Sequence, residues 1–221
     1  MQTFDTPTPV PVVLDIPAGH IRLVAGDRAD TTVEVLPADA SNSRDVKAAE
    51  ETTVGYGEGV LRIERPPAKN RILGSSGFVR VTVHLPAGSP VEAKTASAEL
   101  RGVGRLGDID FEGAQGSVTL EGTGSARLTL LAGDIEIGRL DGPAEISTQQ
   151  GDIRITEATH GRVVLRTEAG QLSVGAAREA SAALDARTDH GRISNSLRNN
   201  GTTTLDIRAT TSYGDITARS L

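Results

Sequence analysis

Residues 144–155 read AEISTQQGDIRI, and their pattern of apolar residues indicates how the chain folds. Ala144, Ile146 and Thr148 alternate with polar residues before the pair Gly151-Asp152, and the alternation continues after the pair with two isoleucines. A period of two is typical of a strand with one buried face. The stretch therefore predicts two short strands joined at a corner, where glycine allows backbone conformations that a Cβ disfavours.

The same pattern occurs seven times toward the C-terminus. Its turn pairs are Ala98-Glu99, Gly116-Ser117, Gly133-Asp134, Gly151-Asp152, Gly170-Gln171, Gly191-Arg192 and Gly214-Asp215. A period near 18 residues is too short for a helical repeat but suits two strands and two turns. One such unit cannot bury enough surface alone, so the units must stack. We predict an all-β fold, namely a single-stranded-repeat β-solenoid, a β-helix-like stack of about seven two-strand rungs.

Residues 1–90 are β-like without the strict repeat. We expect strands at residues 12–16, 20–24, 32–36, 60–63 and 79–83, one helical turn at 46–50 and a loop at 66–77. A solenoid end exposes an unpaired strand edge that proteins cover. We therefore interpret residues 1–90 as an atypical N-terminal β cap and residues 91–221 as the solenoid, together one continuous domain. The alternative is a separate N-terminal binding module.

Composition excludes several classes of function. The chain has no cysteine, so disulfides and thiolate chemistry are absent. Its net charge is −6 and only 2% of its residues are aromatic, which argues against nucleic-acid binding. We find neither a secretory signal nor an apolar run of membrane-spanning length. We expect a cytoplasmic location, with peripheral association with the cell envelope as the alternative.

Two columns of the repeat carry polar groups that could do chemistry. Asp134 and Asp152 follow adjacent corners and could form a calcium site, but the rest of their column is mixed, so turn residues are the default interpretation. Five units place a threonine three residues before the corner, and we expect these hydroxyls to bond the backbone rather than order a ligand. The threonines are Thr95, Thr148, Thr167, Thr188 and Thr211. We identify no catalytic residue, no metal site and no cofactor.

Two motifs resemble a known family. Residues 146–153, ISTQQGDI, look like the "t-x-x-G-D-I" repeats of the bacterial putative-adhesin family, also called the toastrack domain. Residues 81–89, VTVHLPAGS, look like the strand that introduces those repeats, and the resemblance extends over residues 10–221. It implies a β-strand-repeat fold without catalytic residues, in a family often described as of unknown function, some of whose relatives are associated with envelope-stress signalling or surface display.

We therefore expect a non-catalytic scaffold or binding protein. The alternatives are a regulatory partner of an envelope-stress or transport system and a glycan-acting β-helix enzyme. The last unit lacks a polar cap, so its strand edge should expose Ile207, Ile216 and Arg219 and pair with a second copy or a partner protein. Alternatively, residues 195–201 fold over this edge and keep the protein monomeric.

Overall fold

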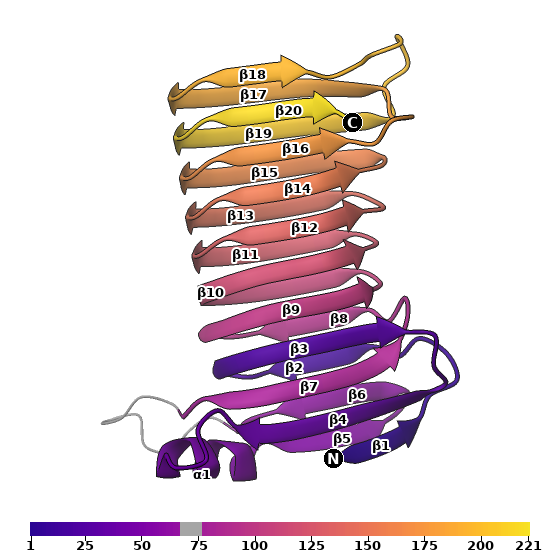
Figure 1. The fold of residues 1–221 in the computed structure, drawn as a ribbon, viewed down its shortest axis with the longest axis vertical. Coiled ribbons are helices and arrows are strands. Elements are labelled where there is room, and N and C mark those ends of the chain that lie inside the picture. Colours follow the sequence, from indigo (N-terminus) through magenta and orange to yellow (C-terminus); the bar gives the residue numbers. More distant parts are fainter. Residues whose placement is uncertain (67–76) are drawn as a thin grey trace.

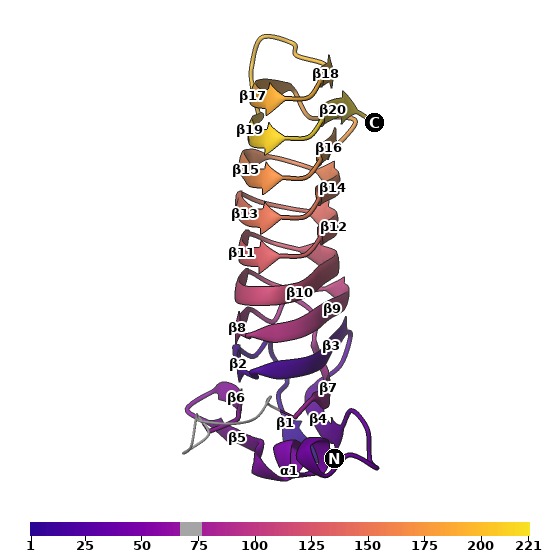
Figure 2. The same ribbon diagram turned by 90° about the vertical axis from the view of Figure 1, so that its left-hand side faces the viewer.

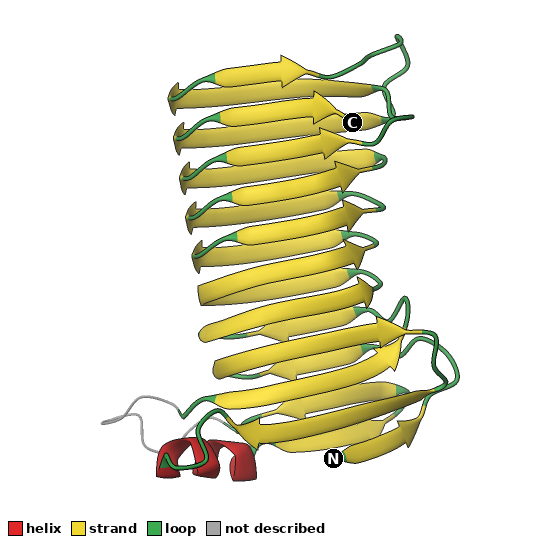
Figure 3. Cartoon of the chain, in the orientation of Figure 1, coloured by secondary structure: helices red, strands yellow, loops and turns green. Residues whose placement is uncertain are grey.

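The computed structural model describes residues 1–66 and 77–221. Over this part of the chain it is a tall, narrow β-solenoid of twenty strands with one short helix at the lower end (Figures 1 and 3). Two parallel sheets face each other, and the chain passes from one to the other at each corner (Figure 2). The predicted all-β solenoid is confirmed.

The front sheet contains the strands that follow the corners. From the lower end upward these are β7 (Val79–Pro86), β3 (Ala18–Gly26), β9 (Ser97–Arg105), the second half of β10 (Ile109–Thr123), β12 (Ile135–Leu140), β14 (Ile153–Ala158), β16 (Leu172–Ala176), β20 (Ile216–Ser220) and β18 (Ile193–Ser196). All these neighbours pair in parallel, as expected for a coil in which each turn adds one strand to each of the two sheets.

The back sheet contains the strands that precede the corners. In the same order these are β6 (Val60–Glu64), β2 (Val12–Asp15), β8 (Val91–Lys94), the first half of β10, β11 (Ala126–Ala132), β13 (Ala144–Gln150), β15 (Gly161–Ala169), β19 (Leu205–Tyr213) and β17 (Ala182–His190). The described residues thus form the seven expected rungs and two more, β6–β7 and β2–β3.

The order of the rungs in space differs from their order in the sequence at both ends. Strands β19 and β20 lie between the β15–β16 rung and the β17–β18 rung, and the C-terminus therefore sits one rung below the top (Figure 1). Likewise, β2–β3 lies between β6–β7 and β8–β9. The last unit of the sequence is therefore not the last rung of the stack.

This order corrects the expectation that Ile207 and Ile216 are exposed. Their exposed fractions are 0% and 1%, because the β15–β16 rung covers them from below and the β17–β18 rung from above. Arg219 points outward and is exposed, one rung below the top, beside its register partner Ser196.

The lower end is covered by antiparallel strands and the helix. Strand β4 (Asp30–Pro37) pairs with β7, β1 (Gln2–Asp5) pairs with β4, and β5 (Thr53–Gly57) pairs with β6. Helix α1 (Ser43–Glu51) is longer than the expected turn and begins at the N-cap Asn42. Strands β1 and β5 were not expected, because their sequences lack a clear alternation. Of the loop expected at residues 66–77, residues 67–76 lie outside the described part.

One hydrophobic cluster runs through the stack from Val10 to Ile216. It includes buried residues on both sides of residue 90, so the proposed cap and solenoid share a core. Four of the five inner threonines donate their hydroxyl to a carbonyl oxygen beside a corner, at 3.0–3.3 Å: Thr148, Thr167, Thr188 and Thr211. The expectation does not hold for Thr95, whose buried Oγ1 has no partner among the described residues.

Candidate functional site

The most unusual surface of the molecule is its upper end, formed by β17 and β18, which we call the open end. Within the described residues β17 pairs only with β19 and β18 only with β20. The inward residue Ile193 is 47% exposed, whereas its register partner Ile216 in the rung below is 1% exposed. Leu184 is likewise only partly buried. The open end thus presents a free strand edge beside an incompletely covered core.

Two hydrogen bonds show which backbone groups of β17 point to the free edge. Leu205 N donates to Ser181 O at 3.1 Å, toward β19, whereas Ala182 N donates to Arg198 O at 2.9 Å, on the opposite side. Successive residues of a strand direct their N–H and C=O groups to alternate sides. The backbone groups of Leu184, Ala186 and Thr188 therefore point to the free edge.

The loop at residues 197–204 covers only the beginning of this edge. Arg198 supplies the carbonyl that Ala182 bonds, and its own N–H donates to Ser220 Oγ at 2.9 Å. The loop stands at the end of the rung opposite the corner (Figure 1). The alternative that residues 195–201 fold over the edge concerned the last unit, β19–β20, and there Asn195 and Ser196 do cover β20 as part of β18. On the open end itself, the loop bonds the edge of β17 only at Ala182.

Charged side chains alternate along the outer face of β17. Asp185, Arg187 and Asp189 are all exposed. Arg187 Nη2 lies 3.6 Å from Asp189 Oδ1, and Asp185 has no ion pair among the described residues. One carboxylate beside the middle of the free strand is therefore available to a partner.

The corner of the open end is tied to the rung below it. The Arg192 guanidinium contacts Asp215 Oδ2 at 2.8 Å, and Arg192 N donates to Asp215 Oδ1 at 2.8 Å. The side-chain bond, followed by the backbone bond, lowers the pKa of the Asp215 carboxyl below its ordinary value. The rings of His190 and Tyr213 stack with their centroids 4.7 Å apart. These contacts hold the β17–β18 rung in register on β19–β20.

Asp134 and Asp152 occupy equivalent places in the middle of the stack. Asp134 Oδ1 accepts a hydrogen bond from Asp152 N at 2.8 Å, and Asp152 Oδ1 accepts one from Gln171 N at 2.7 Å. Each carboxylate thus bonds the backbone of the next corner. Across residues 1–66 and 77–221, no three His, Asp or Glu side chains gather as a metal site would require.

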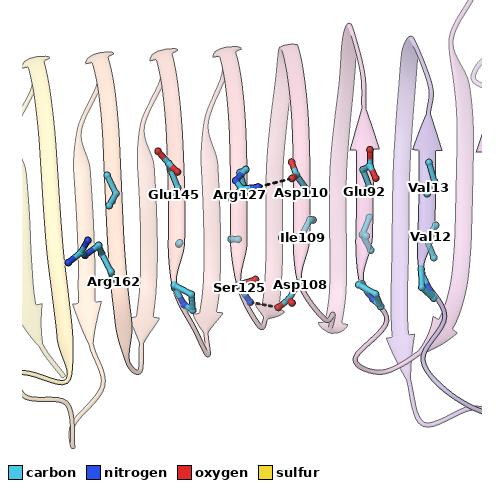
Figure 4. Close-up of a pocket in the computed structure, with 17 residues that line it drawn as sticks. Val12, Val13, Glu92, Asp108, Ile109, Asp110, Ser125, Arg127, Glu145 and Arg162 are labelled. Atoms are coloured by element: carbon cyan, nitrogen blue, oxygen red, sulfur yellow. Dashed lines mark hydrogen bonds and ion pairs between the residues drawn. The ribbon is translucent and has the colours of Figure 1, made fainter.

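A second surface is an open groove of about 600 Å³ on the outer face of the back sheet (Figure 4). It crosses the first residues of six strands, from β2 to β15. Short side chains at this place, such as Pro90, Ser125 and Pro143, leave a depression in the surface. Prolines suit these positions because each precedes or opens a strand.

The charged groups of the groove already have partners. Arg127 lies 3.5 Å from Asp110, Arg162 lies 3.2 Å from Asp206 of the neighbouring rung, and Asp108 Oδ1 accepts from Ser125 N at 2.9 Å. The Ser125 bonds lower the pKa of Asp108. A general acid needs the opposite shift, so Asp108 is a structural acceptor rather than a proton donor.

The sequence columns contain a signal for the open end that the order of the units concealed. The second inner position after each corner reads Gly102, Leu120, Ile137, Ile155, Val174, Asn195 and Ala218. Asn195 is the one polar residue of this column, and it belongs to β18 at the exposed end. A polar residue at an inward position is the expected mark of a terminal rung.

The one helix in the described part of the chain is nine residues long and could not cross a membrane. No curated protein matches the chain. A solved structure described as a "putative adhesin" from Bacteroides fragilis NCTC 9343 is 14% identical, covers 98% of this chain and 95% of its own, and has a TM-score of 0.58. A second, described as a "putative cell adhesion protein" from Clostridium sporogenes ATCC 15579, is 11% identical over 100% and 98%, with a TM-score of 0.40.

At such identities the first of these structures supports the solenoid fold alone. The family described as Toastrack DUF4097 matches residues 13–220, which includes every rung of the stack. This match agrees with the resemblance of the G-D-I repeats. The chain therefore belongs to the Toastrack DUF4097 family.

Proposed function

We propose that this protein is a non-catalytic scaffold that binds a protein strand at its open end. The observation that carries the proposal is the free edge of β17, with the backbone groups of Leu184, Ala186 and Thr188 directed away from β19. Unpaired strand edges recruit further strands, and main-chain hydrogen bonds then supply much of the affinity. A strand added here would also cover Leu184, which is only partly buried.

The pairing of charges supports a structural rather than a catalytic role for the remaining surface. In the groove, the carboxylates of Asp108 and Asp110 are bonded by Ser125 and Arg127. Acid–base catalysis uses titratable groups with perturbed pKa values that face a substrate across a cleft. The corner carboxylates of Asp134 and Asp152 instead bond the backbone.

The test uses a peptide as a probe for strand addition. The probe is a fluorescent nine-residue peptide with the sequence of β17 in which serines replace the residues equivalent to Asp185 and Arg187, so that its binding does not depend on charge. With the protein at nanomolar concentration, we expect saturable binding measured by fluorescence anisotropy. The Ala186→Pro variant should lose this binding, because proline removes an N–H that points to the edge and leaves the bonds to β19 intact.

Leu131→Lys is the control for an exposed apolar side chain away from the open end. Leu131 is 48% exposed, nearly the same as Ile193, but it lies in the middle of the back sheet. This variant should bind the peptide as the unmodified protein does. Equal binding by the Ala186→Pro variant, or loss of binding in the Leu131→Lys variant, would contradict the proposed site.

A further inference from the structure

We infer that the strand bound at the open end belongs to a second copy of this chain, and that the two β17 strands pair antiparallel about a two-fold axis at Ala186. This inference rests on the proposed function, which it extends by naming the partner and the register. It is carried by two features of β17: Asp185 and Arg187 place opposite charges on either side of Ala186, and the strand has the same number of residues on each side of it.

The register follows from the strand itself. Strand β17 has nine residues, Ala182–His190, and Ala186 is the middle one. Arg198 and Asn199 already bond the backbone of Ala182, so the free positions are Leu184, Ala186 and Thr188. Overlap of these positions in two antiparallel copies also places Ala186 opposite its own copy, where a methyl side chain leaves room. Because Ala186 directs its backbone groups to the edge, it can form the hydrogen-bonded pair that an antiparallel ladder requires at this position.

This register makes the outer face self-complementary. Asp185 and Arg187 flank Ala186, so each lies opposite the other in the second copy and two ion pairs form across the axis. These positions are non-hydrogen-bonded pairs, in which side chains approach most closely. A shift that placed Arg187 on the axis would instead oppose arginine to arginine.

The inner face benefits from the same arrangement. Leu184 would lie opposite Thr188 of the second copy, over the partly exposed end of the core. The same axis brings the two β18 strands together, so that the 47% exposed Ile193 is covered. Both faces of the solenoid would then continue from one molecule into the next.

The lower end also has edge strands, since β1 pairs only with β4 and β5 only with β6 among the described residues, but its core is covered: Leu61 and Ile63 are 0% exposed, against 47% for Ile193. Strands β1, β4 and β5 add antiparallel to it, and helix α1 packs beside β4 and β7. A head-to-tail contact would build an open filament, whereas pairing of two identical open ends closes after two molecules. We therefore expect a dimer rather than a fibre.

The experiment measures molar mass by light scattering behind size exclusion. The unmodified protein should run at twice its chain mass of 23.0 kDa at high micromolar concentration. Asp185→Arg and Arg187→Asp should each weaken the dimer by about tenfold or more, because each places like charges opposite one another twice. An equimolar mixture of the two variants should dimerise again, since both pairs become complementary, and the double variant carrying both changes should dimerise with itself.

Arg154→Asp is the control for the change in charge, because Arg154 is exposed on the front sheet away from the edge. This variant should remain dimeric. A monomeric unmodified protein, or failure of the mixture and of the double variant to dimerise, would overturn the inference. If the serine-substituted peptide still binds in either case, the proposed strand-binding function stands and only the second copy is excluded as the partner.

Discussion

Replacing Gly133 with alanine should destabilise the solenoid far more than the same change at Gly122. Gly133 is a corner residue with φ of 136°, and a Cβ there would overlap the carbonyl oxygen of Gly116 in the rung below. At Gly122, the next-to-last residue of β10, the nearest atom to an added Cβ is 3.6 Å away, which is ordinary contact. The two changes are chemically identical and differ only in position.

The expected magnitude combines two costs. A side chain in a sparsely populated backbone region costs about 1–3 kcal/mol. Forcing an extra methyl group into packed structure costs about another 1–3 kcal/mol. We therefore expect the free energy of unfolding to fall by about 4 kcal/mol. For a chain of this size, each kcal/mol lowers the melting temperature by about 2–4 °C, so the total is about 8–16 °C.

Thermal unfolding followed by far-ultraviolet circular dichroism measures both variants. Gly122→Ala should melt within about 2 °C of the unmodified protein, because substitutions without a clash rarely exceed about 0.5 kcal/mol. Equal melting temperatures for the two variants would refute the stacked corner, since nothing would then crowd Gly133.

Three further predictions concern the middle of the stack and the open end. Ile153→Asp buries an unpaired charge and should abolish soluble folding. Arg154→Asp changes the neighbouring residue, which is exposed, and should leave the yield of soluble protein unchanged; similar yields from both variants would mean that the register is wrong. Millimolar calcium should leave the melting temperature unchanged, because Asp134 and Asp152 bond backbone; a rise that disappears in the double asparagine variant would point to a metal site. The pKa of Asp215 is lowered in the folded state by Arg192, so its stabilising effect is present above its ordinary value of 3.8 and is lost as pH falls through the folded pKa. Melting temperatures measured from pH 5 to pH 2.5 should therefore fall less steeply in Asp215→Asn; an identical pH dependence would contradict a role for this ion pair.

The rungs could be predicted from the sequence because each carries its own evidence. Alternation on both sides of Gly151 requires an inner face, and that face is buried as expected at Ile146 and Ile153. An eighth unit also follows the pattern, with Val12, Leu14 and Ile16 before Gly19, but its distance from the other units concealed it.

The order of the rungs could not be predicted in the same way. Every unit presents similar aliphatic side chains to its neighbours, so nothing in the sequence around Ile207 indicates that it lies between Val163 of β15 and Leu184 of β17. Periodicity fixes what faces inward and says nothing about which rung lies next. Only a polar residue in an otherwise apolar column marks the exposed end, as Asn195 does in β18. Which strand edge is free to bind depends on which rung lies at that end.

In this structure β19–β20 lies beneath β17–β18 and leaves β17–β18 as the open end. Cysteine pairs test this arrangement directly, because the chain has no native cysteine. Arg166 is the register partner of Thr210 in β19, and Thr210 is the partner of Arg187 in β17. Neighbouring strands lie about 4.8 Å apart, within the range for a disulfide, whereas strands two rungs apart do not. Under mild oxidation, the Arg166→Cys/Thr210→Cys variant should form an intramolecular disulfide rapidly and the Arg166→Cys/Arg187→Cys variant should not; the opposite result would show that the rungs stack in sequence order.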